Sequence, residues 1–159
     1  MGSACELVLS AALLAACGGV GSGSLTPQTV PFTDHGQTSQ SRVEDGPQMV
    51  VGAAPSATGL AELVATADPA RLYIGVFAGE RRTGGHAVKI DRIERTGDLL
   101  AVTVRFISPP TDALTIQVIT TPAQLVSIDR RSASGVREAV LLDGSGTEMA
   151  RAAVPQSQP

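Results

Sequence analysis

The sequence predicts a mainly β protein: a small antiparallel β-sandwich or a partly open barrel with one short helix. Three observations lead to this fold class. Apolar and polar residues alternate along several short segments, as in a strand with one buried face. Turn-forming residues separate these segments about every 10 to 14 residues. No long helical pattern lies between them, which argues against alternating helices and strands.

Composition limits the core and the partners. The chain has 159 residues, a formal net charge of −3 and 3% aromatic residues. This length allows one modest core plus an extension. The core must be built from Val, Ile, Leu and Ala, because the aromatic residues are only Phe32, Tyr73, Phe77 and Phe106. Nothing in the charge balance indicates a nucleic-acid partner.

The first 16 residues are typical of a lipoprotein signal peptide. Residues 7–16 are apolar, about half of the ~20 residues needed to span a bilayer. The run ends in a string that resembles a bacterial lipobox, Leu14-Ala15-Ala16-Cys17-Gly18. Glu6 stands where a basic residue is usual. We expect a lipid on Cys17 that anchors the protein in the cell envelope, facing the periplasm or the exterior; the alternative is a buried Cys17 at a helix end.

Residues 17–48 are expected to form a flexible tether. This segment is rich in Gly, Ser, Thr, Pro and Gln and has no hydrophobic period. A coil of this length reaches about 30 Å. His35 lies within it and is expected to be solvated. Since Cys5 leaves with the signal peptide and Cys17 is lipidated, no free thiol remains for catalysis.

The β-domain is expected at residues 49–154, beginning with a strand at 49–52. Thr58 is the expected N-cap of a short helix that carries Leu60 and Leu63 on one face and stops before Pro69. We expect this helix to pack as a lid on the sheet. The apolar run 72–77 is too short for a helix and predicts a strand.

The later strands follow from alternation. Strands are expected at 87–90, 99–106, 114–118 and 126–128, and a terminal hairpin at 136–142 and 148–154. Val88 and Ile90 share one face while Ile93 falls on the other, which predicts a bulge near Asp91 and Arg92.

Residues 79–86 form a polar loop between two apolar strands, and they are the candidate protein-binding site. The adjacent Gly84 and Gly85 indicate a positive φ or a close approach of another chain. One interpretation is a tight hairpin with solvated charges; the other is a contact loop for a partner protein. For His86 the alternatives are a half-exposed side chain and a ring stacked on the partner. The candidate residues are Glu80, Arg81, Arg82, Thr83, Gly84, Gly85 and His86.

Residues 79–90 resemble the signature of the PrcB C-terminal domain, found in the protease complex subunit PrcB family. Further matches follow at 99–106, 108–110 and 119–128, so the resemblance covers roughly residues 58–130, the core of the β-domain. Arg82 stands where that family usually has Pro, and His86 and Ala123 stand where it has aromatic residues. The resemblance implies a protein that binds a secreted or surface serine protease and assists its assembly, stabilisation or maturation.

The sequence contains no recognisable set of catalytic residues. His35 and His86 lie far apart, and neither has a His or Cys at ligand spacing. Among the carboxylates, Asp91, Glu94 and Asp129 could pair across strands, but such groups usually face solvent. We therefore expect no enzyme, no metal and no cofactor. Two other functions stay open: a protease inhibitor that presents the Thr83-Gly84-Gly85 loop, and an envelope domain that binds a small ligand.

Overall fold

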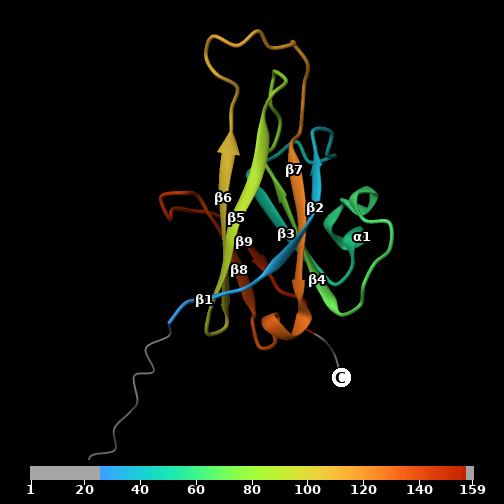
Figure 1. Cartoon of the computed structure of the whole chain (residues 1–159), viewed down its shortest axis with the longest axis vertical. Helices are drawn as coiled ribbons and strands as arrows, with labels where there is room; N and C mark the ends of the chain where they lie inside the picture. Colours follow the sequence, from blue (N-terminus) through green and yellow to red (C-terminus); the bar gives the residue numbers. More distant parts are fainter. Residues whose placement is uncertain (1–25, 157–159) are drawn as a thin grey trace, which may run out of the picture.

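The computed structural model describes residues 26–156, so the expected signal peptide and Cys17 lie outside the described residues. Two sheets pack face to face (Figure 1). Sheet A has the order β1-β5-β6-β8-β9 and sheet B has the order β2-β7-β4-β3. The strands are β1 Gln28–Thr29, β2 Phe32–Thr38, β3 Gln48–Gly52, β4 Arg71–Phe77, β5 Ala87–Thr96, β6 Leu99–Ile107, β7 Ala123–Asp129, β8 Glu138–Leu142 and β9 Glu148–Ala153.

The predicted β-sandwich is confirmed, and the sheets do not close into a barrel. One pairing differs from a purely antiparallel fold, because β6 and β8 run parallel. A parallel pair needs a long connection. Here that connection passes through β7 of the opposite sheet. The expected terminal hairpin is present as β8 and β9, and the expected bulge is present between Ile90 and Arg92.

Strand β4 shows why the core has two parts. Its residues 72–77 are all buried, as its continuous apolar run predicts for a strand covered on both faces. Leu72, Ile74 and Val76 face the main core between the sheets. Tyr73 and Phe77 face a second apolar cluster on the outer side of sheet B.

The tether prediction is wrong for residues 28–38. Strand β2 pairs with β7 from Phe32 to Thr38, and β1 pairs with the end of β5. The imidazole of His35 is not simply solvated, because its Nε2 lies 2.7 Å from Ser127 Oγ. As an edge strand, β2 buries little, so it needs few apolar residues and leaves no hydrophobic period in the sequence.

The helical prediction is corrected at its start. The helix α1, Pro55–Thr58, ends where a helix was expected to begin, and a 3₁₀ turn, η1 Ala61–Leu63, follows. The hydroxyl of Thr58 donates to the carbonyl of Pro55 at 2.7 Å, so Thr58 closes the turn instead of capping its start. Leu60 is nevertheless fully buried in the cluster with Tyr73 and Phe77. The segment therefore covers sheet B, as expected of the lid.

No strand forms at the expected position 114–118. The chain leaves sheet A at Ile107, crosses the end of the sandwich and enters sheet B at Ala123. Leu114, Ile116 and Val118 are exposed there. Alternation describes a strand only where a neighbour supplies backbone hydrogen bonds, and this segment has no strand beside it among the described residues.

Candidate protein-docking tip

Two loops form one end of the sandwich, at the top of Figure 1. We call residues 78–86 and 108–122 together the tip. Residues 78–86 join β4 of sheet B to β5 of sheet A. The interpretation as a tight hairpin is therefore wrong, because the flanking strands lie in different sheets. The loop instead crosses from sheet B to sheet A at the surface of the molecule.

Backbone hydrogen bonds bind the two tip loops to each other. Arg81 N donates to Thr120 O at 2.7 Å, and Thr120 N donates to Arg81 O at 2.8 Å. Further out, Gly84 N donates to Ile116 O at 3.1 Å. Thr120 Oγ1 also donates to Thr83 O at 3.2 Å. Hydrogen bonds thus connect the expected contact loop directly to the 108–122 loop.

Two glycines meet requirements that other residues would not. Gly85 has a φ of +85°, and a Cβ placed on it would lie 3.2 Å from Cβ of Pro109. Gly79 has a φ of +77°, and its Cβ would lie 2.9 Å from the backbone N of Gly46. This close approach lets Glu80 N donate to Glu44 O at 2.7 Å. A third segment thereby supports the base of the tip.

The polar residues of the predicted site divide into structural and exposed groups. His86 Nε2 lies 3.1 Å from Thr83 Oγ1, so the half-buried imidazole closes the loop on itself. Arg81 is half-buried and donates to the carbonyl of Ala78 at 3.0 Å. Glu80 and Arg82 are exposed. Within this loop, Glu80 and Arg82 are the residues whose charged groups are exposed to a partner.

The apolar part of the tip was missed by sequence reasoning. Leu114, Ile116 and Ile119 are 105%, 72% and 60% exposed, and Ile107 and Val118 are exposed beside them. Of these residues, Leu114, Ile116 and Val118 were expected to form the buried face of a strand. Clustered exposed apolar side chains are uncommon on soluble proteins and mark contact sites. The Pro109-Pro110 bend and Asp112 just before the run were the available signs that the chain leaves the sheet.

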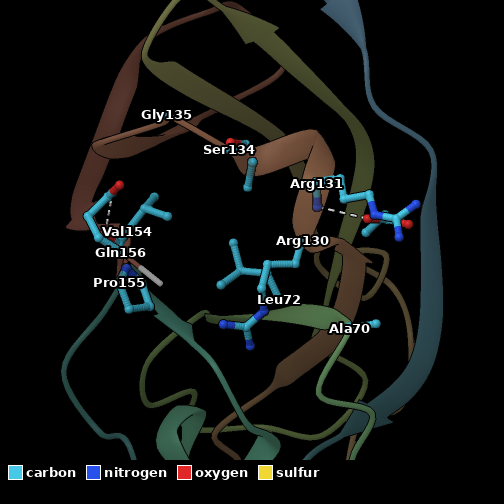
Figure 2. A pocket seen from close by; sticks show the side chains of 11 residues that line it. Ala70, Leu72, Arg130, Arg131, Ser134, Gly135, Val154, Pro155 and Gln156 are labelled. Carbon is cyan, nitrogen blue, oxygen red and sulfur yellow. Dashed lines mark hydrogen bonds between the residues drawn. The ribbon is translucent and has the colours of Figure 1, made fainter. Parts of the chain in front are cut away.

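The opposite end of the sandwich contains an open cavity of about 600 Å³. Leu72 and Arg130 point toward its centre (Figure 2). The guanidinium of Arg130 donates to the carbonyls of Ala53 and Arg71. The wall contains both apolar and polar residues and is lined by Ala70, Leu72, Asp129, Arg130, Arg131, Ala133, Ser134, Gly135, Val154, Pro155 and Gln156.

The carboxylates singled out in the sequence do not come together. Asp91 pairs with Arg105 at 2.6 Å, and Glu94 pairs with Arg92 at 2.9 Å. Asp129 accepts from Arg131 N at the start of the 3₁₀ turn η2, Arg130–Ala133. Within residues 26–156, no three His, Cys, Asp or Glu side chains are grouped to hold a metal ion. Over the same residues no helix has the length and apolarity to cross a bilayer.

Together, the fold and the tip define a β-sandwich that carries exposed apolar side chains on loops at one end. Residues 72–129 match the family described as PrcB C-terminal. The matched region runs from β4 to the end of β7 and includes both tip loops. Neither the curated proteins nor the solved structures contain a match to this chain.

Proposed function

We propose that this is a non-catalytic, lipid-anchored envelope protein whose β-domain binds a protease or another envelope protein and assists assembly or stabilisation of an extracytoplasmic protease complex. The observation that carries the proposal is the exposed apolar tip. The match to the PrcB C-terminal family supports the kind of partner. The membrane contact in this proposal is the lipid on Cys17.

The tip combines exposed aliphatic side chains with charged side chains beside them. Apolar anchors at the middle of an interface usually supply most of the binding energy, while polar residues at the rim set orientation. Leu114, Ile116 and Ile119 would be the anchors, and Glu80 and Arg82 would belong to the rim. Hydrogen bonds from Arg81 and Gly84 already restrict the conformations of the apolar loop. Binding would therefore cost less conformational entropy.

The proposal is tested by affinity capture from detergent-solubilised envelopes. The tip variant carries Leu114→Ser, Ile116→Ser and Ile119→Ser, and the control carries Met149→Ser, an exposed apolar residue of β9. We expect the wild type and the control to capture a protease and the tip variant to lose it. Equal capture by the tip variant would exclude the tip as the contact. If the wild type captures no protease, the protease partnership is wrong.

Two other functions make different predictions in simple assays. An inhibitor would lower the activity of the captured protease, whereas an assembly factor would preserve or raise it.

The cavity at the opposite end favours a small-ligand function, since its volume lies in the range of ligand pockets. In that case Ala133→Trp, which fills the cavity, would abolish ligand-induced thermal stabilisation while leaving protease capture unchanged.

A further inference from the structure

We propose that the 108–122 loop is a proteolytic processing site, cut after Leu114 by an endopeptidase whose specificity pocket takes a large aliphatic side chain. The cut chain remains a folded two-chain sandwich. This inference goes beyond the docking function and does not depend on it. It rests on three features of the loop: access, residue choice and topology.

Access is highest at Leu114. Its side chain is fully exposed. Within residues 26–156, the backbone of Leu114 and Thr115 makes no hydrogen bond; the nearest bonds are Ala113 N to Pro110 O at 3.0 Å and Gly84 N to Ile116 O at 3.1 Å. A protease must take the main chain out of its native contacts, and exposed loop tips are where this is easiest. The Leu114–Thr115 bond is therefore not protected by backbone hydrogen bonds from the described residues.

Residue choice selects the class of protease. The chain contains no Lys or Arg between Arg105 and Arg130, so an enzyme that requires a basic residue has no site in the loop. The loop residues that remain for a protease to recognise are the large aliphatic ones. Ile119 is also exposed, but the peptide bond after it has its N–H, on Thr120, bonded to Arg81 O, and the carbonyl of Ile116 is bonded to Gly84 N. Leu114 is therefore the leucine or isoleucine of the loop whose following peptide bond makes no backbone hydrogen bond within residues 26–156.

The reaction is hydrolysis with water as the co-reactant. Water adds across the Leu114–Thr115 amide and the C–N bond breaks. Leu114 gains a carboxylate, and the nitrogen of Thr115 takes up protons to become an ammonium group. Residues 113–122 carry no charged side chain, and the cut gives them two opposite charges, which raises the cost of burying them against an apolar partner surface.

Topology holds the two fragments together. The first fragment contains β1 to β6 and the second contains β7 to β9. Strand β7 lies between β2 and β4, and β8 lies beside β6, so each sheet contains strands from both fragments. The main core likewise combines Ile74 from the first fragment with Val126 and Leu141 from the second. Separation would require opening both sheets.

The first experiment digests the native full chain separately with α-chymotrypsin, which prefers large apolar residues, and with trypsin, and identifies new N-termini by mass spectrometry. We expect chymotrypsin to produce a fragment beginning at Thr115 before any other cut within residues 26–156. Trypsin should produce no cut in the loop. Leu114→Arg should reverse the two results, while Met149→Ser should leave both unchanged. A first chymotryptic cut elsewhere in 26–156, or inhibition of chymotrypsin without cleavage, would overturn the processing site.

The second experiment runs the nicked protein on a size-exclusion column. We expect the two fragments to elute together at the position of the intact chain in native buffer, and to separate in concentrated urea. Separation in native buffer would overturn the two-chain sandwich. Because neither experiment uses the envelope partner, failure of the docking function would not change these outcomes.

Discussion

The side-chain carbonyl of Gln124 in β7 accepts a hydrogen bond from the backbone N–H of Ile90 in β5, at 2.6 Å, and so joins the two sheets. Gln124 is completely buried, and its amide donates to Asp34 Oδ2 at 2.8 Å. Strand β1 pairs with β5 only at Glu94 and Arg95. Gln124 therefore satisfies an N–H of β5 that no strand covers.

Replacing Gln124 with Leu should destabilise the fold. The substitution keeps a buried side chain of similar size but leaves Ile90 N–H without its acceptor, which typically costs about 1–3 kcal/mol. Urea denaturation would measure the change in the free energy of unfolding. Gln37→Leu, at an exposed position of β2, is the control and should have little effect. Equal stabilities of the two variants would show that the inter-sheet bond is dispensable.

Stability should depend on the protonation of His35. Partial burial, and then the nearby charge of Arg71, lower the pKa of His35 below its ordinary value of 6.5, against an opposing effect of Asp34. The unfolded chain therefore binds a proton more readily than the folded chain. The free energy of unfolding should fall as pH drops from about 7 through 6.5 toward the folded-state pKa.

The control for this pH dependence is His35→Gln. Glutamine can still bond to Ser127 Oγ but does not titrate. Melting temperatures measured between about pH 5 and 8 should show a shallower slope in the variant than in the wild type. Identical slopes would assign the pH dependence to other groups.

Gly85→Ala should destabilise the tip. A residue with a Cβ at positive φ costs about 1–2 kcal/mol, and the new methyl group would press on Pro109. For a domain of this size we expect the melting temperature to fall by roughly 2–8 °C. Gly144→Ala is the matched control, because Gly144 has open space around its Cα and no positive φ. A loss of the same size in the control would contradict this explanation.

Leu60→Ala should test the lid on sheet B. Leu60 is completely buried against Tyr73 and Phe77, so removing most of its side chain should cost about 2–5 kcal/mol. Leu63 lies at the margin of the same cluster and is only half-buried. Leu63→Ala should therefore cost clearly less in the same denaturation assay. The reverse order would mean that the segment packs differently on the sheet.

The parts of the fold that could be predicted from the sequence are those with a local signal. The run 72–77 is apolar on both faces, and the phase change between Ile90 and Ile93 marks the bulge. Strand β2 gave no such signal, because its contacts with β7 rely on backbone bonds and on polar side chains such as His35. Gln124 was an overlooked sign, because an amide side chain within a strand that is buried from residue 123 to 128 needs a buried partner.

The candidate site was predicted only in part. The glycines of residues 79–86 indicated the backbone constraints correctly, since these constraints are local. The sheet to which each flanking strand belongs depends on distant pairing, and so the crossover was not predicted. Alternation at Leu114, Ile116 and Val118 has the same period whether that face is buried or exposed. The sequence therefore could not distinguish a core strand from a projecting loop.

The position of β1 changes how the domain would sit on a membrane. Strand β1, which follows Thr26 closely in the sequence, lies toward the end of the molecule opposite the tip (Figure 1). If Cys17 carries the proposed lipid, only nine residues lead from it to Thr26, a span of at most about 30 Å when fully extended. The greatest height of Leu114 and Ile116 above the bilayer would then be the length of the sandwich plus at most this span. A partner would meet them within that layer, with the search confined to diffusion along the membrane plane.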